Sequence, residues 1–264
     1  MFYFDAHNHL CHSFYPSFSS PVDYSCISSF CTEDEWRDFP YHDRKNILKS
    51  FGLHPQMLAC ADFSAEDFEN GMEVLGRLLK NNEIFAVGEI GFDFFTEEFK
   101  KTEKIQTEFF ERQLDLAAAF GKPIVVHCRK AMDRIFSFSK SLSSLPAVVF
   151  HSFPGGKNDA SSLLKKGVNA FFSFGKHQLM NGKRLSVEML STHSDFPGRI
   201  LFETDCPYQT LKGESETSAA EIALVYEKAR EICGFDSEKI AMAAFSNLLD
   251  SCGFDFGAIP KGNS

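Results

Sequence analysis

The run Phe2–His9, which reads FYFDAHNH, joins an aromatic segment to two histidines at alternate positions. Its short apolar part is typical of a fully buried strand rather than of an amphipathic helix. Side chains at positions i and i+2 of a strand share a face, so His7 and His9 can present both imidazoles to one metal ion. An isolated pair of this kind is equally compatible with two surface histidines on a turn, and the rest of the chain has to decide.

Similar apolar runs recur along the whole chain, and each precedes a polar or helical stretch. Strands are expected at 2–6, 24–30, 47–53, 84–88, 123–126, 147–150, 169–174 and 199–202. Strands that alternate with helical patterns predict parallel β-α-β units, and eight such units predict an α/β fold of the (β/α)8 TIM-barrel type. The stretch 10–46 has short connections rich in Ser, Phe and Pro, which predicts a first crossover helix reduced to a turn.

Helices are expected where apolar residues follow a helical period. An apolar stripe at 110–118 ends before Gly121, and a capping-type signature at 64–67 begins another helix. A third stripe at 222–229 ends before Gly234. We expect a final helix over about 237–249 that seals the outer layer of the barrel.

Bulk composition bounds the architecture. Barrels of this type reach 264 residues as one unit, so we expect a single domain over 1–255 followed by a C-terminal tail at 256–264. The formal net charge of −9 does not favour a protein that coats duplex DNA through a broad basic face. Bound divalent metals would reverse that sign locally.

The eight cysteines are scattered over a chain large enough to need no disulfides. The closely spaced Cys26 and Cys31 lack a zinc-type spacing or a partner pair, so all eight are interpreted as reduced thiols of a cytosolic protein. The chain opens with no basic and apolar leader, and no apolar run approaches the ~20 residues that a membrane span requires. We therefore expect a cytoplasmic location and no membrane partner.

Histidines and carboxylates follow the carboxyl ends of most expected strands. They are His7, His9, His54, Glu89, His127, His151 and Asp205. Barrel enzymes place their active sites at this face, so residues scattered in sequence would converge there. Packing explains such a set poorly, because buried imidazole and charged groups cost free energy unless they are paired or bound to a metal.

Six strings carry these residues in order along the chain. They are Asp5–His9, Gly52–Pro55, Gly88–Asp93, Lys122–Arg129, His151–Phe153 and Glu203–Tyr208. Together they resemble the TatD family of metal-dependent hydrolases, which lies among the amidohydrolase-like barrels. The resemblance extends from residue 1 to about residue 250. Each string alone is weakly specific, whereas the ordered set is specific.

The resemblance implies a site for two divalent metal ions. His7, His9 and Asp205 would hold the first ion, His127 and His151 the second, and Glu89 would bridge both. Imidazole and carboxylate ligands suit Zn, Mn, Fe or Co, and Mg where waters complete the shell. Two such ions can lower the pKa of a shared water and stabilise both oxygens of a phosphoryl displacement. Asp205 is then the expected general base, with Glu89 as the second catalytic carboxylate.

Neighbouring residues are assigned more weakly. Arg129 is the best candidate for a substrate phosphate contact, with a salt bridge on the rim as the alternative. His54 either contacts substrate or satisfies a backbone carbonyl. Asp5 and Glu203 either orient imidazoles or close the barrel end by hydrogen bonding.

Cys128 and Cys206 flank expected ligands and are interpreted as packing residues. Most phenylalanines are expected in the core, with a few at the rim able to stack on bases.

Three functions remain open. The leading hypothesis is a phosphodiesterase, a deoxyribonuclease acting on single-stranded DNA or DNA ends, or on a small phosphoester. The second keeps the metals and cleaves an ester, lactone or amide, because one barrel site supports many reactions. The segment 209–217 favours it, since it is shorter and more acidic than the family's usual loop. The third is a non-catalytic metal-binding barrel. The sequence leaves the metal and the oligomeric state undefined.

Overall fold

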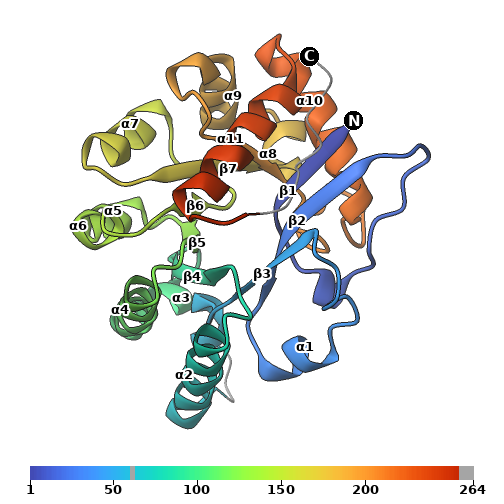
Figure 1. The fold of residues 1–264 in the computed structure, drawn as a ribbon. Helices are drawn as coiled ribbons and strands as arrows, with labels where there is room; N and C mark the ends of the chain where they lie inside the picture. The colour runs from blue at the N-terminus through green and yellow to red at the C-terminus, as the bar shows by residue number, and fades with distance from the viewer. Residues whose placement is uncertain (60–62, 256–264) are drawn as a thin grey trace.

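The computed structural model describes residues 1–59 and 63–255. Within them, eight parallel strands close into a barrel in chain order (Figure 1). The strands are β1 Phe2–Asn8, β2 Asp23–Phe30, β3 Ile47–Phe51, β4 Ala86–Asp93, β5 Ile124–Arg129, β6 Val148–Phe150, β7 Ala170–Gly175 and β8 Ile200–Glu203. All eight expected strands are present, which confirms the predicted TIM-type barrel. The expected tail at 256–264 lies outside the described residues.

The expected bounds of the fourth strand, 84–88, were wrong. β4 runs from Ala86 to Asp93 and pairs with β5 as far as Arg129. Gly91 allows a close approach between β4 and β5. A Cβ at Gly91 would lie 2.0 Å from the backbone oxygen of His127, and its φ of +147° is one that other residues rarely adopt. Glycine therefore extends β4 past Glu89.

Helices surround the strands. They are α1 Glu33–Asp38, α2 Ala65–Lys80, α3 Glu97–Lys101, α4 Glu103–Ala119, α5 Met132–Ser137, α6 Ser139–Leu142, α7 Lys157–Lys165, α8 Lys176–Met180, α9 Arg184–Ser191, α10 Ile222–Cys233 and α11 Ser237–Ser251. Short 3₁₀ turns are η1 Leu10–His12, η2 Pro55–Ala59, η3 His193–Asp195 and η4 Ala219–Glu221. Between β1 and β2 only η1 is formed, so the reduced first crossover is confirmed.

The helix signals in the sequence correspond to real caps. Ser64 and Asp67 form a reciprocal capping box at the start of α2. α4 contains the apolar stripe and buries Phe110 and Leu114. α10 ends at Gly234, whose left-handed φ of +62° terminates the helix.

The last helix differs from the expectation. α11 does not lie in the outer layer but crosses the ring of strands, as the red helix of Figure 1 shows. Its Phe245 and Leu248 pack with interior residues such as Phe4 and Val125. The backbone N–H of Phe2 donates to Glu238 near the start of α11 (2.9 Å), so this helix covers the amino ends of the strands. The opposite end stays open for a site.

An irregularity in β1 sets the orientation of His7. Three steps along β1, from Asp5 to Asn8, match two steps along β2, which is the count of a β-bulge. Ala6 packs with the interior cluster, and strict alternation would turn the next side chain away from it. The extra residue instead lets His7 face the barrel axis, beside Glu89.

The cysteines agree with their interpretation as reduced thiols. The seven described cysteines are free thiols, and Cys60 lies outside the described residues. Cys128 and Cys206 are buried, as expected of packing residues, and burial raises the pKa of each thiol to about 12.

Across 1–59 and 63–255, none of the helices has the length and apolarity to cross a bilayer.

Candidate metal centre

The structure brings the expected donor residues together at the carboxyl ends of the strands. His7, Glu89 and His127 lie on β1, β4 and β5, and the others directly follow strands. Those others are His9 after β1, His54 after β3, His151 after β6 and Asp205 after β8. The convergence that strand register predicted is therefore present in space.

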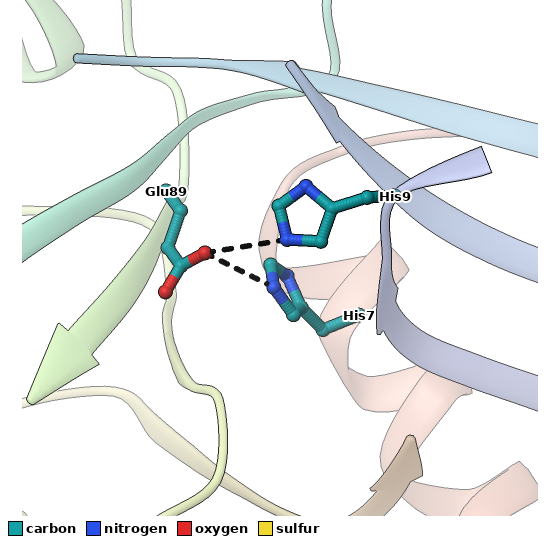
Figure 2. A group of neighbouring side chains, drawn as sticks. All are labelled: His7, His9 and Glu89. Carbon is teal, nitrogen blue, oxygen red and sulfur yellow. Dashed lines mark ion pairs between the residues drawn. The ribbon is translucent and has the colours of Figure 1, made fainter. Parts of the chain in front are cut away.

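Glu89 lies at the middle of this set and faces β1 with one carboxylate oxygen. Figure 2 shows both imidazoles of the His-x-His pair pointing at it. Oε2 of Glu89 is 3.2 Å from Nε2 of His7 and 3.6 Å from Nε2 of His9. The two rings meet edge-on, with centroids 4.9 Å apart. The sequence left two interpretations open, a metal-binding pair or two surface histidines on a turn. The second is excluded, because His7 is fully buried.

The other oxygen of Glu89 faces a second group of imidazoles. Oε1 lies 2.6 Å from Nδ1 of His127, 2.9 Å from Nε2 of His151 and 3.2 Å from Nε2 of His54. One carboxylate thus separates two sets of nitrogen donors. This division is what a bridging ligand requires.

Asp205 lies across the first group from Glu89. Its Oδ1 is 3.4 Å from Nε2 of His7 and 3.5 Å from Nε2 of His9. The backbone N–H of Asp205 donates to the carbonyl oxygen of His7 at 2.9 Å, which ties the end of β8 to β1. The side-chain amide of Gln209 donates to Oδ2 at 3.0 Å.

The donor set fits divalent metal ions. Donor atoms lie within 4.8 Å of one another in three triplets: His7, His9 and Glu89; His7, His151 and Asp205; and His54, Glu89 and His127. Nε2 of His7 is buried without a hydrogen-bond partner, while Nδ1 contacts the hydroxyl of Ser29 at 3.2 Å. An imidazole held by one nitrogen, with the other facing carboxylates, is a common arrangement of a metal ligand.

The charges of the cluster are mutually dependent. Burial opposes ionisation of Glu89, but the imidazoles of His151, His54 and His7 hold the pKa of its carboxyl well below the ordinary value. Burial acts likewise on Asp205, and its contacts with the imidazoles of His7 and His9 lower the pKa of its carboxyl below the usual range. The two carboxylates are therefore anionic at neutral pH, and cations stabilise the cluster.

Asp93 was not singled out by the sequence, although it belongs to the Gly88–Asp93 string. Its Oδ2 lies 3.1 Å from Nε2 of His127 and accepts from the side-chain amide of Gln56 at 2.6 Å. Burial opposes ionisation, but these two hydrogen bonds lower the pKa of Asp93 to about 2. The i, i+4 spacing from Glu89 on one strand was the available signal, since such residues share a face.

The two neighbouring carboxylates divide between their expected alternatives. Asp5 accepts from the backbone N–H (2.9 Å) and hydroxyl (2.7 Å) of Thr204, and thus joins β1 to the end of β8. Glu203 lies 3.3 Å from Nδ1 of His151 and accepts from the backbone N–H of Ser152 at 2.8 Å. Asp5 therefore closes the barrel end, whereas Glu203 is positioned to orient an imidazole.

The two expected substrate contacts lie in different places. His54 is inside the donor cluster, with its Nε2 3.2 Å from Oε1 of Glu89. Arg129 lies at the rim with its side chain 43% exposed, and its Nη1 is 3.7 Å from Oδ2 of Asp93. Its guanidinium stacks 4.0 Å from the ring centre of Phe95, which is half exposed.

The segment after β8 reaches the centre. Gln209 contacts Asp205 and the hydroxyl of Ser152. The ammonium of Lys176, at the carboxyl end of β7, is buried and pairs with Glu214 at 2.5 Å and with Glu221. These ion pairs hold the acidic segment over the mouth of the barrel.

A parallel eight-stranded barrel with imidazoles and carboxylates at the carboxyl ends of its strands defines the class of metal-dependent barrel hydrolases. Residues 4–251 match the family model described as TatD related DNase. The chain belongs to the TatD family of metal-dependent hydrolases.

Relatives of this chain carry both general and specific descriptions. An uncharacterised metal-dependent hydrolase of Methanocaldococcus jannaschii is 29% identical over 208 residues, which are 76% of this chain and 74% of the relative. A protein named 3'-5' ssDNA/RNA exonuclease TatD, from Erwinia billingiae, is 33% identical over 159 residues. That match spans 60% of this chain and 56% of the relative.

Solved structures support the fold. A TatD homologue from Escherichia coli superposes with a TM-score of 0.75 at 22% identity, covering 94% of this chain and 96% of that one. A TatD family hydrolase from Entamoeba histolytica gives a TM-score of 0.66 at 16% identity, covering 94% and 97%. Both likenesses concern the barrel and not the substrate.

Proposed function

We propose that the protein is a binuclear metal-dependent phosphodiesterase that acts on single-stranded DNA, including DNA ends. His7, His9 and Asp205 would hold one divalent ion and His127 and His151 the other, with Glu89 between them. The observation that carries this assignment is the division of donors between the two oxygens of Glu89. His54 lies close enough to Glu89 to be a further ligand of the second group.

Two divalent ions at this centre would supply Lewis acidity to an attacking water and to a scissile phosphate. The chain's own carboxylates then handle the proton. Asp205 directs Oδ1 toward the imidazoles of His7 and His9, so its carboxylate is positioned to accept a proton from the attacking water. The amide of Gln209 fixes the second oxygen of Asp205, which orients the carboxylate for that task.

The rim beside His127 favours a nucleic acid. Arg129 and Lys130 both approach the ring of Phe95, at 4.0 Å and 4.6 Å from its centre. A guanidinium binds phosphate oxygens in a bidentate manner, and an exposed aromatic ring stacks on an unpaired base. The combination fits a single strand and locally offsets the acidic net charge. The name of the Erwinia relative, which describes an exonuclease of single-stranded DNA and RNA, is in agreement with this substrate class.

A second candidate keeps the centre and changes the bond, to an ester, lactone or amide of a small molecule. The acidic segment 209–217 favours it, because the one ammonium of Lys176 pairs with both Glu214 and Glu221, which leaves a negative net charge at the mouth. Polyanionic substrates are repelled by such charge, whereas neutral ones are not.

A panel of substrates separates the two candidates. The full chain, supplied with Mg²⁺ or Mn²⁺, is incubated with short labelled single-stranded oligonucleotides and with a set of esters, lactones and amides. We expect oligonucleotide cleavage. Turnover of only the small molecules would reject the phosphodiesterase and support the second candidate.

Arg129→Ala tests the proposed phosphate contact. Because a charge-assisted hydrogen bond contributes about 1.5–3 kcal/mol, the variant should raise KM for single-stranded DNA about tenfold or more with little change in kcat. Arg112→Ala is the matched control, since this guanidinium also stacks on a ring, 4.7 Å from the centre of Phe68, but pairs with Glu69 on another helix. Equal KM values for both variants would remove Arg129 from the substrate site.

A further inference from the structure

A second group of metal-type donors lies beside the centre and shares no residue with it. Cys11 and His12 belong to η1, after β1, and Glu35 belongs to α1, after β2. Their donor atoms all lie within 4.8 Å of one another. Nε2 of His12 is 3.0 Å from Oε1 of Glu35.

The carboxylate of Glu35 is held in place by the start of its own helix. Oε2 accepts from the backbone N–H groups of Cys31 (2.7 Å) and Thr32 (3.3 Å), as part of the capping box of α1. Oε1 is thereby turned toward His12, and the thiol of Cys31 also approaches it at 3.3 Å. Oε2 of Glu35 therefore fixes the carboxylate on the backbone, and Oε1 faces the other two donor residues.

The turn η1 is fixed as firmly. The backbone N–H of Leu10 donates to the hydroxyl of Ser28 at 3.1 Å, and that of His12 donates to the carbonyl of His9 at 2.9 Å. Cys11 is half-buried, with its sulfur 3.6 Å from the carbonyl oxygen of Ser29. The donor atoms of η1 and α1 therefore lie close together on two segments whose backbones are held by hydrogen bonds.

We propose that Cys11, His12 and Glu35 bind a further transition-metal ion of the zinc class, separate from the histidine and carboxylate centre. A thiolate, an imidazole and a carboxylate are ligands that Zn²⁺ takes in tetrahedral sites. Three protein ligands leave a fourth position for water. The sequence did not reveal the group, because its donors lie on two crossovers and follow no Cys-x-x-Cys spacing.

The site borders the mouth of the barrel. The ring of Tyr208 lies with its centre 5.2 Å from that of His9 and 6.5 Å from that of His12, between the two donor groups. His12 is exposed, with 40% of its side chain accessible, so an ion beside it faces solvent. Such an ion adds positive charge at the entrance of a chain whose formal net charge is −9.

Cobalt titration tests the proposal without any substrate, so its outcome does not depend on nuclease activity. The full chain is stripped with a chelator and titrated with Co²⁺, while near-ultraviolet absorption reports cobalt–thiolate bonds. The histidine and carboxylate centre contains no sulfur, so a cobalt–thiolate band does not arise from that centre. We expect the band in the wild type, its loss in Cys11→Ser, and at least tenfold weaker binding in His12→Gln and Glu35→Gln.

Controls separate this site from other thiols and from the centre. Cys233→Ser removes a half-buried thiol on α10 and should leave the band unchanged. Asp205→Asn should also retain the band, because it alters only the centre. The exposed His12 variant keeps the test informative if Cys11→Ser unfolds. A wild type without the band, a band that survives in Cys11→Ser or is unweakened in His12→Gln, or its loss in Asp205→Asn would overturn the proposal.

Discussion

At the scale of single residues, Glu89 organises the centre because its two oxygens face different donors. The imidazoles on and directly after β1 approach Oε2, and those after β3, on β5 and after β6 approach Oε1. A monodentate carboxylate on a neighbouring strand could serve only one of these groups. The extension of β4 through Gly91 keeps Glu89 within a strand, and the pairing of β4 with β5, which is irregular between Val87 and Ile90, resumes directly after it. Its position is thus a property of the barrel wall and not of a loop.

Asp93 provides a prediction at the same scale. In Asp93→Asn, the carboxylate that holds Nε2 of His127 becomes an amide, so the imidazole loses its charged partner. Removal of such partners costs about 10–100-fold in metal affinity or activity. Metal retained after dialysis against a graded chelator should fall by that factor while the thermal midpoint stays near the wild type. Asp133→Asn, on an exposed position of α5, serves as control. If Asp93→Asn retains as much metal as Asp133→Asn, Asp93 does not support metal binding by His127.

The sequence predicted the convergence of donors because each follows an apolar run that could be recognised locally. It could not predict which groups meet across the mouth. The contact of Asp93 with His127 and the group of Cys11, His12 and Glu35 depend on side-chain directions set by neighbouring strands. Periodicity contains no information on such contacts between distant segments.

At the scale of elements, α11 closes the amino end of the barrel. The ring of Phe245 stacks on Phe4 with centroids 3.8 Å apart, and Phe2 lies 5.9 Å away. Figure 1 shows this helix in red, crossing the ring of strands. The sequence predicted a helix over about 237–249, but the prediction that it lies in the outer layer was wrong. The position of α11 could not be predicted from its own sequence, because it depends on which end of the barrel the other elements leave uncovered.

Phe245→Ala tests this role. A buried phenylalanine replaced by alanine costs about 3–5 kcal/mol of unfolding free energy, through lost burial and the cavity that remains. Urea unfolding should show that loss with an unchanged slope. Phe235→Ala, at a residue that is 52% exposed, should cost far less. A loss below 1 kcal/mol for the Phe245 variant would mean that α11 does not seal the interior.

The bulge of β1 illustrates why the presence of a strand was predicted better than the directions of its side chains. The strand was recognised from its aromatic run, and simple alternation was expected to bring His7 and His9 to one side. The two histidines do converge, but through a bulge and a chain turn beyond Asn8. A one-residue shift reverses the facing of a side chain, so the pattern alone could not establish it.

At the scale of the molecule, the closed barrel concentrates charge that is dispersed in the sequence. Lysine and arginine are outnumbered by acidic residues, 27 to 36, yet Arg129 and Lys130 gather with Phe95 at one part of the rim. The acidic segment 209–217 lies elsewhere on the mouth, anchored through Lys176. An anionic single strand would therefore be guided toward the basic side.

The most direct test of the central claim joins metal content to cleavage in one set of samples. Wild type, Asp205→Asn and the exposed control Asp115→Asn are stripped of metal, reloaded with Mn²⁺ or Zn²⁺, analysed by mass spectrometry and assayed on labelled single-stranded DNA. The account predicts no cleavage by any stripped sample, restored cleavage with two ions at the centre for wild type and Asp115→Asn, and none for a folded Asp205→Asn. Undiminished cleavage by Asp205→Asn, or by metal-free wild type, would contradict it.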